Sequence, residues 1–526
     1  MDLTKLPEKP SLPEIIEAEF RLSDGNDLLG LRLPAEIISN GQLDGITTVT
    51  PTVRYFSIIS WMIKRYFELK GQDNYACFYQ FAKKIETAVV VGNILQNKQV
   101  QQLVGIREAV HKINSEKEAI SLSGLVKNHA INIYYRSALN LGFLSDRENV
   151  PGLYKERGKP LSDAVDSLLK DIDFLQKINT KDEIQDVHRD ELMAFGSTFP
   201  MGKPANEELK YLIEGILPSN PGRNEFPRLR TYCLLLYLTD RKKRIIDEND
   251  IFTEISRPTL DGLPNGLKPA FDLWVKFVVR DMIVAVHEAS VYWVGDYLRN
   301  SGGRISWEKV INDMASNLDN GLNALGFKEI GPDSAISVFY KKVTNQLGDL
   351  NQKGEMLRWN GKISENAVAK AANFSSDFPS MAILLPLAWI IAVQRFSLCK
   401  NKEDAADFTR IGLSSVIKPA VDCWQTSSAT ILETVQELLK RSVEQHFRIA
   451  WSRYASDPSK DVAVLSSDNE EWIFIKLLSS GRANSRLYQC INWLKQLRLV
   501  TPDGITEEAK LLLSDRIKLI EQGWPA

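Results

Sequence analysis

Residues 47–70 read TTVTPTVRYFSIISWMIKRYFELK, a stretch that carries five aromatic rings and four basic side chains. At about 100° per residue, its apolar side chains fill one broad arc of a helix. These side chains are Tyr55, Phe56, Ile58, Ile59, Met62, Ile63, Tyr66 and Phe67. Thr50 is expected to cap the helix, and Pro51 suits its first position. The pattern therefore predicts an amphipathic helix whose aromatic residues mostly lie in a core.

The opposite arc of this helix is polar, but it includes one large aromatic residue. The arc consists of Arg54, Ser57, Trp61, Lys64, Arg65 and Glu68. An indole among charges leaves two interpretations. Another part of the protein covers Trp61, or Trp61 and Arg65 anchor a protein partner, since Trp and Arg are frequent interface anchors. Three cations and a glutamate are too few for a membrane-surface helix, so we expect no membrane contact.

Outside this stretch the helical period continues and clean alternation is rare, which predicts a mainly α-helical protein of several domains. Breaks rich in glycine and proline, such as STFPMGKPANEE at 197–208, divide the chain. We expect five consecutive segments: an N-terminal arm at 1–46, a helical domain at 47–175 that ends in a winged helix, helical domains at 176–300 and 301–458, and a C-terminal winged-helix-like domain at 459–526.

The composition is that of an ordinary globular protein in a reducing compartment. A net charge of −2 over 526 residues excludes a protein that coats nucleic acid with its whole surface. The five cysteines include no CxxC pair, so we expect no disulfide, no structural zinc and a cytoplasmic location. The longest uncharged run, 378–394, holds Pro386 and is shorter than the roughly 20 residues a membrane span needs, which favours a buried, kinked helix.

Two distant segments echo each other: YYRSALNLGFLSDRENVPGLYKERGKPLSDAV at 134–165 and LYQCINWLKQLRLVTPDGITEEAKLLLSDRI at 487–517. Each reads as an amphipathic helix, a short apolar exit, a turn and a second helix. This order resembles the end of a winged-helix domain, in which the third helix leads into a two-stranded wing. In the second copy Asp503 and Gly504 suit a tight hairpin turn, and Thr506 suits a helix start. The alternative is a plain helical hairpin.

Both copies lack acidic residues over a long stretch, which favours contact with a polyanion. Acids are missing between Glu471 and Asp503 and between Glu118 and Asp146. Arg, Gln and Asn on one helix face can make bidentate contacts to base edges. The predicted nucleic-acid-binding residues are Arg482, Arg486, Gln489, Asn492 and Lys495 in the second copy, and Asn128, His129, Asn132 and Arg136 in the first. The alternatives are a solvated face without acids and a surface that binds protein.

The usual catalytic signatures are missing from the sequence. It contains no GxxxxGK[ST], HExxH, GxSxG or GxGxxG motif. The remaining candidates are Asp281, His287 and Glu288 on a nearly apolar helix at 278–298. Buried charges need partners, so we interpret these residues as a structural network with Arg280, and an acid-base or metal site is the alternative. We expect no bound metal and no cofactor.

Three stretches in the first third of the chain resemble large, poorly characterised bacterial helical proteins found among genome-defence genes. They are NDLLGLRLPAEI at 26–37, DGITTVTPTVRYFSIISWMIKRYFE at 44–68 and LGFLSDRENVPGLYKERGKPLSDAV at 141–165. The resemblance carries no catalytic motif. It implies a setting, an antiviral or genome-defence assembly, and no mechanism.

Three hypotheses follow from the sequence. The first is a non-enzymatic bacterial protein that binds nucleic acid, with DNA the expected partner, inside a defence assembly. The second is a helical scaffold or adaptor subunit whose winged helices dock on protein partners such as an ATPase. The third is an enzyme with a site around Asp281, His287 and Glu288. We favour a protein without enzymatic activity.

Overall fold

The computed structural model describes residues 27–96, 102–113, 118–122, 124–178, 186–255, 260, 262–353, 368, 382–397, 421–478 and 483–523. Contacts divide the chain into two compact units. Unit 1 takes residues 1–39, 249–263 and 271–485, and unit 2 takes residues 40–248, 264–270 and 486–526. The segments expected from the sequence are consecutive, whereas each of these units is assembled from three separate stretches.

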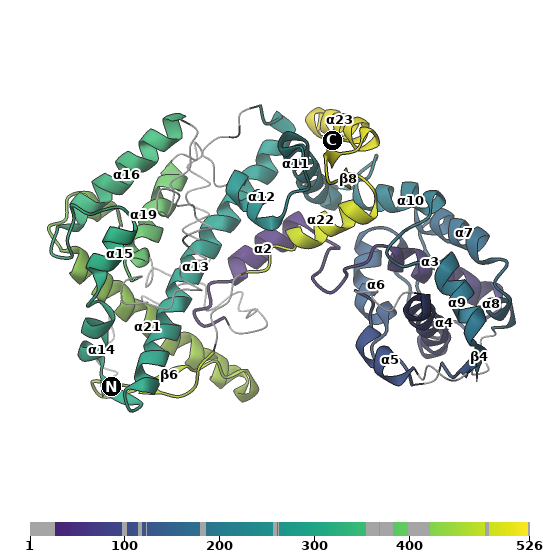
Figure 1. Ribbon diagram of the computed structural model, residues 1–526, viewed down its shortest axis with the longest axis horizontal. Coiled ribbons are helices and arrows are strands. Elements are labelled where there is room, and N and C mark those ends of the chain that lie inside the picture. The colour runs from purple at the N-terminus through teal and green to yellow at the C-terminus, as the bar shows by residue number, and fades with distance from the viewer. Residues whose placement is uncertain are drawn as a thin grey trace. The chain divides into compact units, whose positions relative to one another are not determined.

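The protein is mainly helical, as predicted (Figure 1). The helices of unit 2 are α3 (Arg54–Glu68), α4 (Tyr75–Gln96), α5 (Ile106–Lys112), α6 (Ala130–Asn140), α7 (Gly158–Leu169), α8 (Asp173–Lys177), α9 (Arg189–Thr198), α10 (Asn206–Ile216), α11 (Phe226–Lys242), α22 (Leu487–Gln496) and α23 (Glu507–Gln522), with the 3-10 turns η2 (Arg223–Glu225) and η3 (Asn265–Leu267). α2 (Leu33–Gln42) is divided between the two units.

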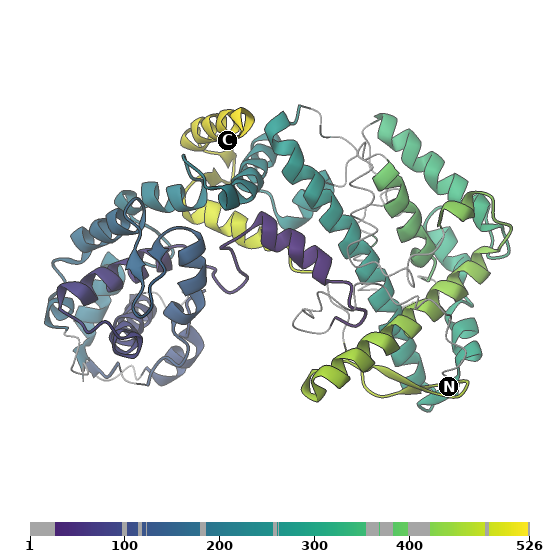
Figure 2. The ribbon, with the colours of Figure 1, turned by 180° about the vertical axis from the view of Figure 1, so that it is seen from behind.

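Unit 1 is built around two long helices that cross, α13 (Lys268–Asn300) and α21 (Ile431–Ser456), which are joined by a hydrogen bond between His287 and Ser442 (Figure 2). Its helices are α12 (Glu248–Ile255), α13 (Lys268–Asn300), α14 (Trp307–Met314), α15 (Leu318–Ala324), α16 (Ile336–Lys353), α19 (Leu384–Ser397) and α21 (Ile431–Ser456), with η4 (Val421–Gln425) and η5 (Pro458–Lys460). Its described sheet has the order β5 (Arg304–Ser306), β7 (Glu471–Phe474), β6 (Leu465–Asp468), and both pairings are antiparallel.

Unit 2 contains three short antiparallel ladders. β1 (Ala119–Ile120) pairs with β4 (Val187–His188), β2 (Leu144–Ser145) with β3 (Gly152–Leu153), and β8 (Val500–Thr501) with β9 (Gly504–Ile505). The last two ladders each join a pair of helices, α6 to α7 and α22 to α23. The predicted order of helix, hairpin and helix is therefore present in both copies. The winged-helix assignment itself is not shown and stays a prediction.

Local signals explain the second hairpin and the helix after it. Gly504 has a φ of +117°, a conformation that L side chains rarely adopt, in keeping with its place in the tight turn. The side chain of Thr506 accepts a hydrogen bond from the backbone N–H of Ala509 and so caps α23. The turn at Gly504 and a helix start at Thr506 were predicted from the sequence, whereas the capping role of Thr506 was not.

α3 is the central helix of unit 2, since α4, α6, α7 and α10 all contact it. The apolar arc predicted for residues 47–70 is buried except for Phe67, which is 36% exposed. Half of the predicted polar arc is buried too: Arg54, Ser57 and Trp61. The predicted cap is wrong. The helix begins at Arg54 without a side-chain cap, and the Thr50 hydroxyl donates to the Thr47 carbonyl oxygen instead (3.1 Å).

α4 and α9 approach closely because glycines face each other where they cross. A Cβ added to Gly196 would lie 2.1 Å from the carbonyl oxygen of Gly92. In Figure 1, α4 is seen nearly end-on among α3, α6 and α9.

The uncharged run is described from residue 382 onward, where it forms most of α19. Its described side chains are buried except for the half-buried Val393, and Pro386 lies in the first turn of the helix, where proline is tolerated. None of the helices in the described ranges is both long and apolar enough to cross a membrane.

Candidate functional site

Three tyrosines of unit 2 form an aromatic surface on α4 and α6, which we call the tyrosine platform: Tyr75, Tyr79 and Tyr135. The rings of Tyr75 and Tyr79 are nearly parallel, 7° apart with their centroids at 6.2 Å. Tyr135 meets Tyr75 edge-on at 6.5 Å. Tyr75 is 38% exposed, and the other two rings are partly exposed. The platform thus presents ring surface to solvent on neighbouring helices.

Asn132 ties the platform together from α6. Its side-chain nitrogen donates to the Tyr79 hydroxyl at 2.9 Å, and its side-chain oxygen accepts from the Tyr75 hydroxyl at 3.4 Å. Asn132 was predicted to contact bases directly. Its amide nitrogen and oxygen instead hold the hydroxyl groups of two tyrosines, so it orients the rings.

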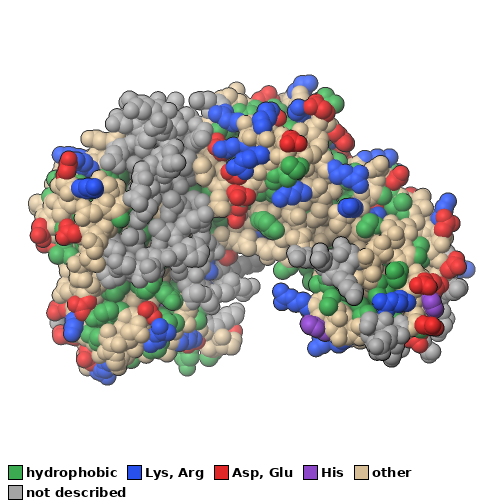
Figure 3. Space-filling view, viewed as in Figure 1, with side chains coloured by type: hydrophobic (Ala, Val, Ile, Leu, Met, Phe, Trp, Pro, Cys, Tyr) green, Lys and Arg blue, Asp and Glu red, His purple; other side chains and the backbone are tan. Residues whose placement is uncertain are grey.

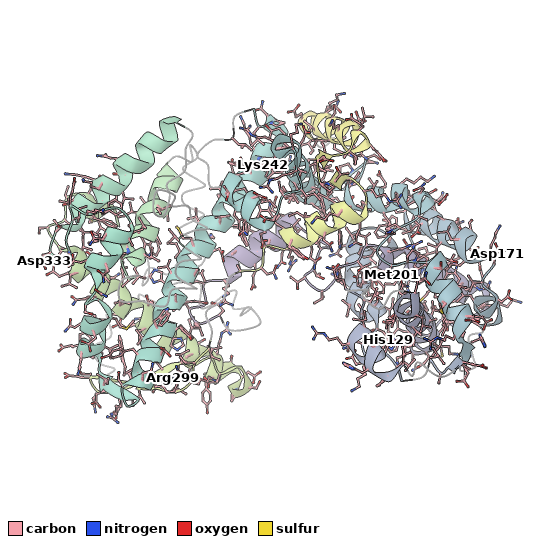
Figure 4. All side chains as sticks on the ribbon, viewed as in Figure 1. His129, Asp171, Met201, Lys242, Arg299 and Asp333 are labelled. Carbon is pink, nitrogen blue, oxygen red and sulfur yellow. The ribbon has the colours of Figure 1, made fainter. Side chains whose placement is uncertain are left out.

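Beneath the platform, a buried carboxylate fixes the start of α6. Glu86 of α4 accepts hydrogen bonds from the backbone N–H groups of Ala130 (2.5 Å) and Ile131 (2.8 Å). A negative charge at a helix N-terminus is stabilising. His129 is only 4% exposed; its Nδ1 lies 3.4 Å from Glu86, and its ring meets Tyr79 edge-on at 6.0 Å. His129, marked in Figure 4, therefore supports the platform from below and does not face a ligand.

The charges at the platform are mainly basic. Lys83 places its Nζ 4.5 Å from the centre of the Tyr79 ring, and Arg136 lies exposed on α6. Asn128 and Lys127 are exposed just before α6. Two acids are close: the Tyr135 hydroxyl donates to Asp146 at 3.5 Å, and the buried Glu86 lies beneath the rings.

The phenols of Tyr75 and Tyr135 stay neutral near pH 7. Burial, helped by neighbouring phenols, raises the pKa of Tyr75, and burial together with Asp146 raises the pKa of Tyr135. A neutral aromatic face beside cations can stack on a base while the cations meet phosphates.

Of the residues predicted near α6, Asn128, Asn132 and Arg136 are exposed and His129 is buried, and the platform rings Tyr75, Tyr79 and Tyr135 were not predicted. Asn128, His129, Asn132 and Arg136 do lie together. Tyr75 and Tyr79 are four residues apart, so they share a helix face, and that spacing was the available signal.

The polar arc predicted for the second copy points into unit 2. Side-chain nitrogens of Arg486, Gln489 and Asn492 donate to backbone carbonyl oxygens of residues 46–53 at 2.9, 3.1 and 2.9 Å. Gln496 accepts from one N–H of that segment and donates to one of its carbonyl groups. Amide and guanidinium groups can bind peptide backbone as well as base edges. Here their partner is the backbone of residues 46–53 in the same unit. Arg486, Gln489 and Gln496 are therefore committed to contacts inside unit 2, and the half-buried Asn492 also lines a cavity of that unit.

Two more residues were predicted for the second copy, Lys495 and Arg482. Lys495 is exposed on α22. Arg482 lies outside the described residues.

Trp61 is 2% exposed and lies inside unit 2. Its indole Nε1 donates to Asp166 of α7 at 2.9 Å. Of the two interpretations, burial within the protein holds, and the partner-anchor interpretation is corrected because the indole has no exposed face. Arg65 is 19% exposed, and its guanidinium is 3.7 Å from Glu68.

Replacing Trp61 with Phe should lower the free energy of unfolding by about 1.5–3 kcal/mol, because the indole hydrogen bond to Asp166 is lost and the smaller ring leaves a gap in the core. Lys64 still donates to Asp166 in this variant. Urea unfolding measures this loss of stability. The control is Trp451→Ala, since Trp451 is 72% exposed and should change stability by less than about 0.5 kcal/mol. Equal losses in the two variants would contradict the assignment.

Asp281, His287 and Glu288 are all buried on α13, but their contacts go to different parts of unit 1. Asp281 accepts from the backbone N–H of Ala483 at 2.9 Å. Glu288 accepts from the backbone N–H of Leu28 at 3.1 Å and forms an ion pair with Arg32. These carboxylates bind segments far away in the sequence, and their expected pairing with Arg280 stays a prediction.

His287 lies in a chain of hydrogen bonds that uses both ring nitrogens. Trp389 Nε1 donates to His287 Nε2 at 2.8 Å, which leaves Nδ1 to donate to the Ser442 hydroxyl at 2.7 Å. That hydroxyl donates to the Leu438 carbonyl oxygen. Burial lowers the pKa of His287 to about 3. The imidazole is neutral and both of its ring nitrogens are hydrogen-bonded to the protein, so it makes a poor general base.

The described part of the chain holds no group of three or more His, Cys, Asp or Glu residues placed to bind a metal. Four cysteines are described, and each is a free thiol: Cys77, Cys233, Cys423 and Cys490.

Comparison with known proteins identifies no relative. No family model, no curated protein and no solved structure matches the chain.

Proposed function

We propose that the protein is a non-enzymatic nucleic-acid-binding protein that holds single strands on the tyrosine platform. The observation that carries the proposal is the nearly parallel, partly exposed pair Tyr75 and Tyr79, with Tyr135 beside them and Lys83 and Arg136 at hand. Proteins that bind single strands without sequence preference combine such stacking rings with cations.

The cations beside the platform, Lys83 and Arg136, support the proposal, whereas the net charge of the whole chain does not. The face in Figure 3 mixes Lys and Arg with Asp and Glu, as expected for a net charge of −2. Binding would therefore be confined to a patch. Unstacked bases are needed to cover the rings, and a duplex keeps its bases stacked, which favours single strands over duplex DNA.

The experiment is a fluorescence-anisotropy titration of the full chain with labelled single-stranded DNA, single-stranded RNA and duplex DNA. Tyr75→Ala and Tyr79→Ala should each weaken single-strand binding by about 5- to 150-fold, from the roughly 1–3 kcal/mol of a stacked base. Tyr75→Phe should keep most of the affinity, because the ring remains. Tyr154→Ala is the matched control, since Tyr154 is 49% exposed in the same unit and lies outside the platform.

Salt dependence tests the cations separately. Lys83→Met and Arg136→Met should each lower the slope of log affinity against log salt by about 0.7, the value for one phosphate contact of a single strand. No single-strand binding at low salt, or full binding by the double variant Tyr75→Ala/Tyr79→Ala with its fold intact, would refute the proposal.

The cellular setting of the proposal comes from the sequence. Cysteine usage supports the cytoplasm, and the resemblance in the first third of the chain supports a bacterial antiviral assembly. Binding to a phage-infected cell's single strands would fit that setting.

A scaffold or adaptor role is the second candidate, and one observation favours it. Trp451 is 72% and Tyr454 51% exposed, three residues apart on α21 in unit 1, with Arg448 exposed one turn earlier. Trp, Tyr and Arg are the residues that anchor protein interfaces most often. Loss of a co-purifying subunit in Trp451→Ala, with single-strand binding unchanged, would support this role.

A further inference from the structure

Unit 2 contains a cavity of about 680 Å³ whose wall combines apolar surface with several uncharged polar side chains. Five of the lining residues are carboxamides from three parts of the chain: Asn93, Gln96, Gln102, Asn492 and Gln496. Met201, marked in Figure 4, lies in the same wall. The volume is within the range of small-molecule sites, roughly 300–1,000 Å³.

Two of these carboxamides are fully used by the protein. Asn93 accepts from the backbone N–H of Met201 at 2.9 Å and donates to two carbonyl groups. Gln496 bonds to the backbone on both sides of Thr52. They keep the wall rigid and have little left to offer a ligand.

The pair Asn492 and Gln102 is different. Asn492 uses its amide nitrogen twice, toward the Pro51 carbonyl oxygen (2.9 Å) and toward Gln102 Oε1 (3.1 Å). Within the described ranges, no hydrogen bond reaches Oδ1 of Asn492 or involves Nε2 of Gln102. An acceptor and a donor on two joined amides therefore remain at the cavity wall.

That pair complements a planar group that carries a donor next to an acceptor. Nucleobases have such edges, and Asn and Gln are the side chains that read them. Among the described residues that line the cavity, Lys203 alone is charged. A single cation beside neutral amides suits an anionic group such as a phosphate.

We propose that this cavity binds a nucleotide, with the base edge on Asn492 and Gln102 and the phosphate toward Lys203. The site is separate from the tyrosine platform, which shares none of its residues. It places no acid-base pair near the ligand, so the expected event is binding without chemistry.

The test is isothermal titration calorimetry of the full chain with AMP, GMP, CMP and UMP, and with the matching nucleosides. At least one nucleotide should bind, and its nucleoside should bind about tenfold more weakly, as expected for loss of a charge-assisted contact. Lys203→Met should remove this preference for the phosphate. Lys210→Met is its control, because Lys210 is exposed on α10 outside the cavity.

A steric variant tests the location. A Cβ at Gly202 meets no atom within 4 Å, so Gly202→Leu should fold normally and fill part of the cavity. It should weaken nucleotide binding at least about tenfold, as a filled pocket loses over 1.4 kcal/mol. Gly41→Leu is the matched control, since its Cβ also meets nothing within 4 Å and lies outside the cavity.

The outcomes separate this site from the platform. Tyr75→Ala should leave nucleotide binding unchanged while it weakens strand binding. No binding of any of the four nucleotides at millimolar concentration, or unchanged binding in Gly202→Leu, would overturn the proposal. Binding of a simple dipeptide in place of the nucleotides would overturn it too, and would point to a peptide amide as the ligand.

Discussion

Replacing Arg54 with Ala is expected to destabilise the protein by about 3–5 kcal/mol, the typical cost of removing one partner of a buried ion pair. Arg54 is 1% exposed, and Glu208 is fully buried. The Arg54 Nε lies 3.0 Å from one carboxylate oxygen of Glu208 and 3.1 Å from the other. Without the guanidinium, the carboxylate keeps its desolvation penalty and loses its counter-charge.

The guanidinium of Arg54 also contacts the segment between α9 and α10. It donates to the Pro200 carbonyl oxygen at 2.9 Å and lies 3.8 Å from the centre of the Phe199 ring. Pro200 lines the carboxamide cavity. Arg54→Ala should therefore weaken the cavity wall as well as the fold.

Urea unfolding at pH 7 measures the effect of Arg54→Ala. The control is Arg65→Ala on the same helix, whose partly exposed pair with Glu68 should be worth less than about 1 kcal/mol. The double variant Arg54→Met/Glu208→Gln should recover part of the loss, because no charge stays buried. A single variant as stable as the control would show that the carboxylate finds water or another donor.

Acidification from pH 7 to 5 is expected to destabilise unit 1 by about 4 kcal/mol, because each of two buried histidines contributes up to about 1.4 kcal/mol per pH unit below its unfolded pKa. Burial lowers the pKa of His287 from 6.5 to about 3 and that of His446 from 6.5 to about 4, although a hydrogen bond to Leu28 and the charge of Asp461 oppose the shift of His446. Since the folded pKa lies below the unfolded one, the unfolded chain binds protons first as the pH falls.

The direction of the pH effect follows from that difference. The stabilisation by neutral His287 and His446 is complete above pH 6.5 and is lost as the pH falls toward the folded pKa values of about 3 and about 4. The geometry agrees: His446 Nε2 accepts from the Val464 backbone N–H at 3.0 Å, so protonation there would break a hydrogen bond.

The measurement is the urea midpoint of the full chain at pH 7, 6 and 5, above the range where most carboxylates titrate. His446→Gln should be less stable at pH 7 but should lose about half of the pH slope, because only His287 remains. His111→Gln, at an exposed histidine, should keep the whole slope. An unchanged slope in His446→Gln would show that this ring does not stay neutral in the folded state.

Local sequence signals determined the helical class and several turns of this protein. The 3.6-residue period predicted the helices, and Gly504 and Thr506 predicted the second hairpin and the start of α23. These features depend on backbone preferences and on neighbours within a few residues, which a sequence displays directly. The burial of the aromatic arc of α3 was predictable for the same reason, since apolar side chains leave water wherever the chain allows it.

The tertiary structure determined which polar side chains are internal. A helical period shows which arc is polar but not what covers it. Glu208 reaches Arg54 from 154 residues away, and Glu288 binds Leu28 from 260 residues away. In the same way the polar arc of α22 meets residues 46–53 where a nucleic-acid strand was expected. A polar group can be satisfied by water, by a ligand or by distant backbone, and only the folded chain selects among them.

Both candidate sites are long-range as well. The tyrosine platform needs α4 beside α6, and the carboxamide cavity needs Asn492 beside Gln102, 390 residues apart. The sequence supplied the residue types for recognising bases, because those types follow from hydrogen-bonding chemistry. Their meeting depends on the packing of helices that are distant in the chain, and no local preference encodes that packing.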